Sequence, residues 1–576
     1  MTPDTDNREW QQALQVIQFT RRSLFLTGKA GTGKSTFLKY VCQNTKKKHV
    51  VLAPTGIAAI NVGGTTLHSF FKLPFHPLLP NDSKYSVRNI RKELKYSGEK
   101  IKLIRELELI IIDEISMVRA DIIDFIDRVL RIYSGNMREP FGGKQLLLVG
   151  DVFQLEPVVR EEEWRLLSPI YPNPYFFSAK VFQEMKLISI ELRKVYRQRN
   201  PEFIAILDRI RSNSATDSDI AALNRRVSNE TTNDNAGLSI TLATRRDTAD
   251  HINQQRLNDL EGEPTTFFGK ITGEFPDTSL PTPTELQMKP GAQVIFIKND
   301  RDRRWVNGTL GIVSAIDEAH NAISVITEDG NEYEVGKEVW ENMRYRFNAK
   351  EQKIEEEQIG TYTQLPVKLA WAITVHKSQG LTFRRATIDF TGGTFASGQT
   401  YVALSRCTSL EGICLKAPLR RADIRVRPEV LTFASHYNDS GTLNAALHES
   451  QADKEYRDAA NYFDNGDFNR FLDAFFKAIH ARYDIEKPVA RRYIRRKLNI
   501  INTQRRQIDE LREQLTQQQD FLHQLAAEYV SMAHECEHDH MNDAAIRNYE
   551  KALRLYPESQ EIKRRLEKLT KKKKRS

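Results

Sequence analysis

Residues 24–40 read LFLTGKAGTGKSTFLKY, an apolar strand-like run followed by a glycine-rich turn and then by helical periodicity. Strand, loop and helix in this order form the context in which a phosphate-binding loop works. The glycines let backbone N–H groups wrap the phosphates, the lysine reaches the β and γ oxygens, and the serine hydroxyl ligates Mg²⁺. The stretch therefore predicts a site for a nucleoside triphosphate and Mg²⁺. Its residues are Gly28, Gly31, Thr32, Gly33, Lys34, Ser35 and Thr36.

A carboxylate pair ends a second apolar run, LELIIIDEIS at residues 107–116. Asp113 can hold the hydrated Mg²⁺, and Glu114 can position or deprotonate an attacking water. An acidic helix cap after a buried strand would look the same. Together with the loop, the pair favours hydrolysis over binding alone.

A third polar group follows the apolar run LLLV at residues 146–149. Asp151 and Gln154 come directly after it, where a polar side chain can sense the γ-phosphate and pass its loss to neighbouring loops. Gln154 is therefore a further candidate.

Length and composition limit the class of protein. A chain of 576 residues is too long for one hydrophobic core and should form roughly three to five domains. No apolar run approaches the ~20 residues of a membrane span, and the first residues resemble no leader peptide, so we expect a soluble, cytoplasmic protein, nucleoid-associated in a bacterium. The four cysteines lack metal-ligand spacing, so we expect neither zinc nor a disulfide. The net charge of +9 only modestly favours polyanionic partners.

The order of segments predicts an α/β protein. Short β-rich runs alternate with helical periodicity over the first 165 residues and return near residues 240 and 386, as expected of parallel sheets. Closely spaced strands around residues 291–365 predict a small β insertion, and the chain becomes helical and charged after about residue 430. The predicted boundaries are 1–165, 166–290, 291–365, 366–430 and 431–576.

The helical C-terminal region contains an internal repeat. Ala459, Tyr462, Phe475 and Ala478 have the same spacing as a second set, which is Ala533, Cys536, Tyr549 and Ala552. Both stretches resemble tetratricopeptide repeats, although a generic helical hairpin would satisfy the same spacing. The intervening stretch has an approximate heptad pattern that a coiled coil would explain, and the chain ends in the basic tail KKKKRS.

Eight motifs, in order, resemble those of superfamily 1B helicases, and of the Pif family in particular. They are GKAGTGKST, APTGIAA, TTLHSFF, IIIDEISMV, PFGGKQLLLVGDVFQLEPV, LRKVYRQ, ITVHKSQGLTF and YVALSRC, and they cover roughly residues 7–425. The resemblance implies two RecA-like domains with an SH3-like β insertion in the second. Glu156 departs from the family pattern, which usually has proline there, and this puts the stiffness of that loop in doubt.

The resemblance also assigns roles around the nucleotide. Gln11 would read the adenine of ATP, although Gln12 beside it leaves the register open. Gln154, Arg197 and Arg406 would contact the γ-phosphate, the two arginines as charge-stabilising fingers. Gly380 would belong to the nucleotide site, near the boundary between domains where nucleotide state and DNA binding would be coupled.

A further set of residues matches positions where this family contacts single-stranded DNA, largely through phosphate and sugar. The set is Thr55, Thr66, His68, Thr374, His376 and Lys377. Phe70, Phe71 and His68 could supply stacking faces for bases, although two adjacent phenylalanines are more often core residues.

The pattern as a whole indicates an ATP-dependent DNA helicase that acts on single-stranded and tailed duplex DNA. The resemblance implies 5′-to-3′ translocation and a role in DNA replication, repair, recombination or maintenance of telomere- or G-quadruplex-type structures. The helical region could bind a protein partner. Alternatives are a phosphate-loop ATPase that remodels proteins and a tetratricopeptide scaffold with a degenerate ATPase, which would be expected to have lost Lys34 or Glu114.

Overall fold

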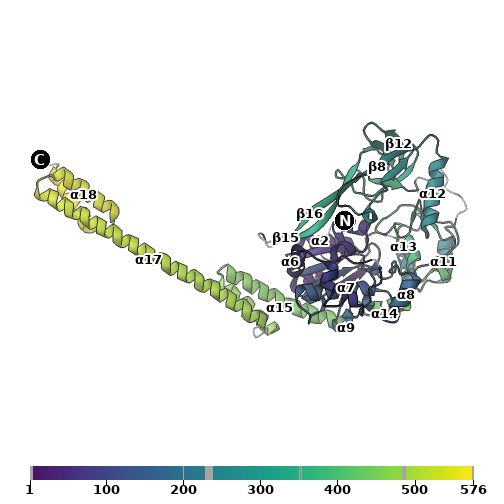
Figure 1. The fold of residues 1–576 in the computed structure, drawn as a ribbon, viewed down its shortest axis with the longest axis horizontal. Helices are drawn as coiled ribbons and strands as arrows, with labels where there is room; N and C mark the ends of the chain where they lie inside the picture. Colours follow the sequence, from purple (N-terminus) through teal and green to yellow (C-terminus); the bar gives the residue numbers. More distant parts are fainter. Residues whose placement is uncertain are drawn as a thin grey trace. The chain divides into compact units, whose positions relative to one another are not determined.

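The computed structural model describes residues 4–573, apart from 5, 75, 199, 228–237, 349–350, 352 and 483–487. The chain divides into two compact units, Met1–Ala481 and Arg482–Ser576, which are described separately (Figure 1). Within the described ranges, no helix is long and apolar enough to cross a membrane.

The first sheet of the larger unit has six strands in the order β3–β2–β4–β5–β1–β6. Neighbouring strands all run parallel, with Leu24 opposite Leu147 and Ile188. The parallel α/β architecture predicted from the alternation of segments is therefore confirmed. The strands are β1 (Leu24–Gly28), β2 (His49–Ala53), β3 (Thr65–Thr66), β4 (Leu109–Ile112), β5 (Gln145–Val149) and β6 (Ile188–Leu192).

Side chains alternate between the two faces of this sheet, as the pleat requires. Leu24 and Leu26 pack with α1 and α2 on one face, whereas Phe25 packs with α7 on the other. Burial on both faces explains why the strands read as continuous apolar runs. The helices of this part are α1 (Arg8–Phe19), α2 (Lys34–Asn44), α3 (Gly56–Val62), α4 (Leu67–Phe71), α5 (Ile90–Leu94), α6 (Gly98–Glu106), α7 (Ala120–Ser134), α8 (Glu161–Leu167) and α9 (Val181–Glu184).

The second sheet has four parallel strands in the order β18–β7–β19–β20. Its strands are β7 (Ile240–Ala243), β18 (Ala372–Thr374), β19 (Ala386–Asp389) and β20 (Ile413–Leu415). The flanking helices are α10 (Pro201–Arg211), α11 (Asp217–Asn224), α12 (Arg246–Asp259) and α13 (Gln399–Leu404). The chain leaves the first sheet only after β6, so this second part begins later than the predicted residue 166.

An antiparallel β region lies between β7 and β18 in the sequence and is larger than the predicted 291–365. Its long hairpin, β15 with β16, reaches the first sheet, where the Tyr345 hydroxyl accepts a hydrogen bond from the Val51 N–H at 3.1 Å. Tyr345 and Phe347 join the hydrophobic core there. The strands are β8 (Thr265–Phe268), β9 (Lys270–Gly273), β10 (Glu285–Met288), β11 (Gln293–Phe296), β12 (Leu310–Asp317), β13 (Ala322–Thr327), β14 (Glu332–Val335), β15 (Glu338–Asn348), β16 (Lys353–Gln364) and β17 (Val367–Leu369).

Residues 428–447 run along the edge of the first sheet and onto α1. After α14 (Pro428–Ala434), the Asn438 side chain accepts a hydrogen bond from the Glu191 N–H of β6 at 2.9 Å. Leu443 and Ala446 of α15 (Ser440–Asp464) are then buried in the core that contains α1. α16 (Phe468–Ala481) packs on α15, so the larger unit runs past the predicted boundary at 430 to Ala481.

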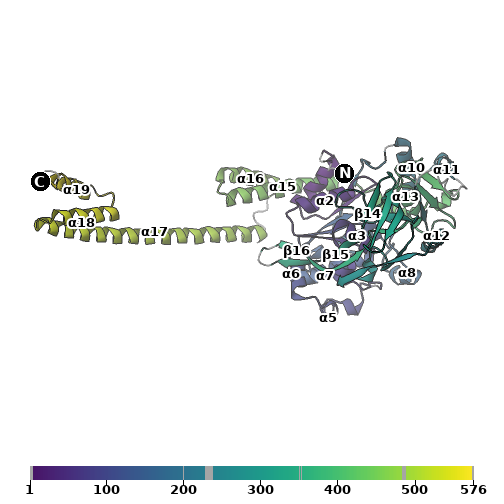
Figure 2. The same ribbon diagram turned by 90° about the horizontal axis from the view of Figure 1, so that it is seen from above.

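The smaller unit contains α17 (Pro488–His538), α18 (Asn542–Leu555) and α19 (Gln560–Lys573), all visible in Figure 2. Ala533, Tyr549 and Ala552 from the predicted repeat are buried where α17 and α18 meet. Their counterparts Ala459 and Ala478 are buried in the α15–α16 hairpin of the larger unit. The last three residues of the basic tail lie outside the described residues.

The packing of α15 predicts where the chain can be shortened. A protein ending at Asn438 would lack Leu443 and Ala446 and would expose the apolar face of α1 on which they pack. Its free energy of unfolding should be lower than that of the full-length protein by about 3–5 kcal/mol, the transfer free energy of Leu443, Ala446 and part of Leu447. A protein ending at Ala481 keeps α15 and is the matched control. Thermal unfolding of both proteins checks this, and equal midpoints would contradict it.

Candidate nucleotide site and nucleic-acid interface

The phosphate-binding loop joins β1 to α2 and has the backbone that its glycines permit. Gly31 and Gly33 have φ values of 82° and 85°, in the left-handed region that favours glycine. A Cβ on Gly31 would also lie 2.4 Å from Cβ of Arg197, which comes from beyond β6. The Lys34 ammonium donates to the carbonyls of Gly28 (2.7 Å) and Lys29 (3.0 Å), so it is held over the loop. Burial lowers the pKa of Lys34.

The predicted carboxylates lie beside this loop, at the end of β4. Burial raises the pKa of Asp113 to about 6, and burial together with the charge of Asp113 raises the pKa of Glu114 to about 7. Glu114 has a left-handed backbone (φ 50°), a strained conformation costing about 1–3 kcal/mol that is typical of functional sites. The Gln379 amide, from the second sheet's side, donates to Glu114 Oε2 at 3.0 Å. Glu114 therefore contacts both α/β parts.

Gln154 lies in the same cluster, because the Gln379 amide also donates to its Oε1 at 3.4 Å. Beside it, the buried Asp151 accepts a hydrogen bond from the Arg211 guanidinium at 3.1 Å. Arg211 also pairs with Glu191 of β6 at 3.1 Å and lies 4.2 Å from the centre of the Phe153 ring. An arginine at the end of α10 thus ties the second part to two elements of the first.

The two predicted arginine fingers lie near each other, Arg406 buried and Arg197 half-buried. Arg197 donates to the Ser405 carbonyl at 3.3 Å, and Arg406 donates to the carbonyls of Val402 (3.1 Å) and Ser378 (3.4 Å). Burial, and then the neighbouring charge of Arg197, lower the pKa of Arg406 to about 9. Two cations held this close favour an anion between or beside them.

The remaining predicted nucleotide residues have simpler surroundings. Ser35 is exposed in the first turn of α2, whereas the Thr32 hydroxyl is buried and donates to the Lys29 carbonyl at 2.9 Å. Gln11 is exposed and Gln12 half-buried in the first turns of α1, so the register of the adenine contact stays open. Gly380 has a φ of 84°, next to Gln379.

Several residues of the cluster were not predicted from the sequence. The Tyr401 hydroxyl accepts a hydrogen bond from the Ala30 N–H of the loop at 2.9 Å, and Lys29 pairs with Asp208 of α10. Arg211 and Gln379 complete this set. Tyr401 and Gln379 lie inside quoted motifs, which was the one signal available, whereas Asp208 and Arg211 lie outside the motifs.

On the first sheet, the predicted DNA-contacting residues lie at the carboxyl edge. Thr55 follows β2, and Thr66 ends the adjacent strand β3. Their hydroxyls accept hydrogen bonds from backbone N–H groups and so cap α3 and α4, respectively. His68 is half-buried on α4, and burial lowers its pKa. Phe70 and Phe71 are core residues, so the hypothesis that they stack on bases is wrong for this structure.

On the second sheet, the matching group follows β18. The Thr374 hydroxyl accepts a hydrogen bond from the Lys377 N–H at 3.2 Å, and the Lys377 side chain is exposed. The His376 ring lies parallel to that of Phe395, with centres 6.2 Å apart, and burial lowers its pKa. Burial thus favours the neutral form of both histidines, and Lys377 is the lysine among these six residues.

The antiparallel region borders the group around Thr55. A Cβ on Gly56 would lie 2.9 Å from Cα of Ser279, and the Asn307 amide donates to Asn61 at 3.3 Å. Both contacts are on α3. The inserted strands thus stand next to the candidate DNA surface of the first sheet.

Glu156, the departure from the family pattern, has specific partners. Its carboxylate accepts hydrogen bonds from the Ser397 N–H at 3.1 Å and from the Arg427 guanidinium at 2.6 Å. The loop after β5 is therefore fixed by an ion pair to the segment before α14.

Comparison with known proteins identifies relatives of this chain. The family model described as PIF1-like helicase matches residues 6–219. The chain is 32% identical to the ATP-dependent DNA helicase PIF1 of Xenopus laevis (75% of this chain, 65% of that protein), and 33% identical to Pif1 of Campylobacter jejuni (67% and 87%). It spans between 60% and 65% of the length of PIF1 from Xenopus laevis, Homo sapiens and Rattus norvegicus.

Solved structures match over the same part of the chain. The structure of Bacteroides sp Pif1 in complex with ADP-AlF4 is 40% identical, with a TM-score of 0.69 over 75% of this chain and 97% of that one. Bacteroides Pif1 bound to ssDNA is 40% identical, with a TM-score of 0.56 over 77% and 98%. About a quarter of this chain thus has no counterpart in these two structures.

Proposed function

This chain belongs to the PIF1-like helicase family, and from that premise we propose that it is an ATP-dependent DNA helicase. It would move along single-stranded DNA, 5′-to-3′ by family resemblance, and unwind duplex DNA. Its proposed setting is DNA replication, repair, recombination or the maintenance of telomere- or G-quadruplex-type structures.

The observation that carries the proposal is the bond between Glu114 and Gln379. It joins the candidate general base on the first sheet to the segment after β18 that contains Thr374 and Lys377. Hydrolysis would change the environment of Glu114, and Gln379 would pass that change to the candidate DNA surface two residues away. The structures of Bacteroides Pif1 in complex with ADP-AlF4 and bound to ssDNA support the nucleotide half and the DNA half of this proposal.

In the proposed reaction, a water oxygen forms a bond to the γ-phosphorus as the bond to the ADP oxygen breaks. Glu114 takes the proton of the attacking water. Lys34, Gln154, Arg197 and Arg406 stabilise the charge on the γ-phosphoryl oxygens. Ser35 and Asp113 offer the oxygen ligands that Mg²⁺ prefers, and bound Mg²⁺ would neutralise phosphate charge.

We further propose that the two parallel sheets form RecA-like domains, divided after β6, with β8 to β17 as an SH3-like insertion in the second. The α15–α16 and α17–α18 hairpins would be tetratricopeptide-like and could bind a protein partner.

The experiment that tests the function compares ATP hydrolysis with and without single-stranded DNA, and unwinding of duplexes with a 5′ or a 3′ tail. DNA-stimulated hydrolysis with unwinding from the 5′ tail is expected. A rate of ATP hydrolysis that does not change when DNA is added would instead indicate an ATPase that remodels proteins.

DNA affinity should fall log-linearly with salt concentration, because binding to phosphates releases counterions. Replacing Lys377 with Ala should lower the slope by about 0.7, the contribution of one neutralised phosphate on a single strand. Lys377→Arg keeps the charge and is the matched control. Fluorescence anisotropy of labelled single strands across a salt series measures the slopes, and equal slopes for Lys377→Ala and the unaltered protein would remove Lys377 from the interface.

A further inference from the structure

α17 contains a long stretch that is exposed on all sides. Every residue from 498 to 524 is exposed, and the core shared with α18 and α19 begins only at Ala526. This stretch is about 40 Å long at the rise of an α-helix. Since helices in water depend on packing of an apolar face, a bare helix of this length needs a partner.

The exposed stretch and the turn before it have a seven-residue apolar repeat. Apolar side chains recur at every seventh position from 494 to 522, and all of them are between 38% and 57% exposed. Leu511, 63% exposed, and Leu525 add apolar side chains three residues after two of these positions. A strict period of seven, rather than 3.6, is the signature of a left-handed coiled coil. The repeat, here called the α17 seam, is Ile494, Ile501, Ile508, Leu515 and Leu522.

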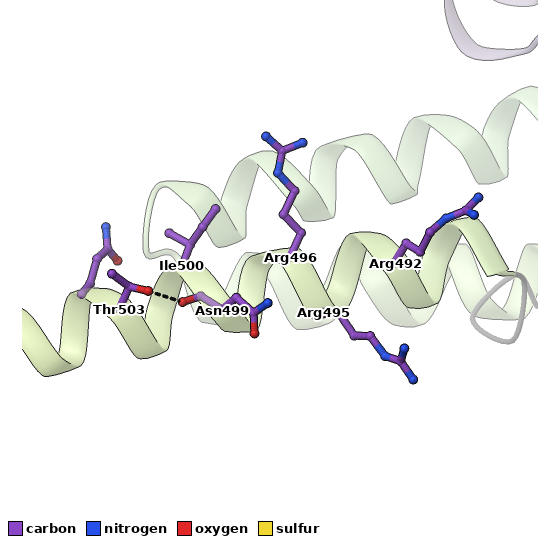
Figure 3. Close-up of a pocket in the computed structure, with 7 residues that line it drawn as sticks. Arg492, Arg495, Arg496, Asn499, Ile500 and Thr503 are labelled. Atoms are coloured by element: carbon purple, nitrogen blue, oxygen red, sulfur yellow. Dashed lines mark hydrogen bonds between the residues drawn. The ribbon is translucent and has the colours of Figure 1, made fainter.

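The other faces of the stretch are polar, so the seam is one-sided. Arg492, Arg495 and Arg496 are exposed at positions outside the seam, and Figure 3 shows their guanidinium groups extending away from the helix. Further along, the outward positions alternate between acids, bases and amides. The neighbours of the seam include Leu498, Ile500 and Phe521, which are also exposed and widen the apolar face.

We propose that the α17 seam pairs with the α17 seam of a second copy of this chain, in a parallel two-stranded coiled coil. Isoleucine at the first core position of a heptad with leucine three residues later favours two parallel strands, and Ile508 with Leu511 has this pattern. In a parallel pair, Arg512 would face Gln507 of the other copy. In an antiparallel pair with position 508 opposite position 509, Arg505 would face Arg512, and like charges across a seam are destabilising.

The proposed dimer contact and the candidate ATP site lie in different parts of the chain. The seam lies in the smaller unit, whereas the nucleotide cluster lies wholly in the larger one. The match to Bacteroides Pif1 covers 97–98% of that protein yet leaves about a quarter of this chain unmatched. The dimer is therefore a property of this chain's helical extension and does not depend on the proposed helicase activity.

The test is the mass of the full-length protein in solution by sedimentation across a concentration series. The unaltered protein should sediment as a dimer of the 66.4 kDa chain at micromolar concentration. Ile501→Lys combined with Leu515→Lys should give the monomer mass over the same range. Asn502→Lys combined with Thr516→Lys adds the same charges one position further along, outside the seam, and should remain dimeric.

Orientation is tested by cysteine cross-linking in the same full-length protein. Leu522→Cys alone should form an intermolecular disulfide under mild oxidation, because a parallel register places both cysteines side by side. A monomeric unaltered protein, a dimer that survives the seam substitutions, or cross-linking only between an Ile494→Cys copy and a Leu522→Cys copy would overturn the proposal. The two full-length lysine variants should have the same rate of ATP hydrolysis, which depends on the larger unit, and the same circular dichroism spectrum.

Discussion

Replacing Glu114 with Gln should lower ATP hydrolysis by about 10²–10⁴-fold while leaving ATP binding nearly unchanged. The amide keeps the shape of the side chain and can still interact with Gln379, which lies 3.0 Å from Glu114 Oε2. It cannot accept a proton from water at the pH of the reaction. Phosphate release in a single turnover, together with titration of a fluorescent ATP analogue, separates the two effects.

Lys34→Ala provides the contrast, because it should weaken both binding and hydrolysis.

The pH dependence of turnover is a second test of Glu114. Burial raises the pKa of Glu114 to about 7, so its charged fraction, and with it turnover, should grow as the pH rises through 7 in the unaltered protein. The Glu114→Gln protein should lack this rise. Near-normal turnover by that variant would remove Glu114 from the mechanism.

Replacing Arg211 with Met should destabilise the larger unit by about 3–5 kcal/mol. The change keeps much of the packing volume against Phe153 but leaves Asp151, whose side chain is 0% exposed, without its cation. Glu191 loses its partner as well. Denaturant unfolding, followed by tryptophan fluorescence, measures the loss.

Arg246→Met is the matched control, because Arg246 pairs with Asp250 at the surface, with 77% and 58% of the two side chains exposed. Such a pair contributes at most about 1 kcal/mol. If the Arg211 and Arg246 variants unfold at the same denaturant concentration, the buried pair does not hold the two parts together.

The parts of the fold that could be predicted from sequence are those whose signal is local. The phosphate-binding loop occupies consecutive residues, and the strands of a parallel sheet buried on both faces read as unbroken apolar runs. The strand β6 has a weaker signal, because Ser189 and Glu191 alternate with its buried residues, and so its place in the first sheet was not anticipated.

The site residues that were missed depend on contacts between distant segments. Tyr401 meets the loop residue Ala30 across 371 positions of sequence, and Arg211 meets Asp151 across 60. Neither pairing has a local pattern. The contact of the β15–β16 hairpin with Val51 also joins distant segments. The sequence around Tyr345 reads as an ordinary strand and does not indicate that its side chain meets the first sheet.

The packing of α15 on α1 has a mechanical consequence. Leu443 and Ala446 are buried with Val16 and Ile17, and the Arg457 guanidinium lies 5.4 Å from the centre of the Phe19 ring at the end of α1. A force applied to the α15–α16 hairpin therefore acts on α1, the helix that contains Gln11 and Gln12. Movement of this hairpin would therefore be transmitted to the helix on which the predicted adenine contact lies.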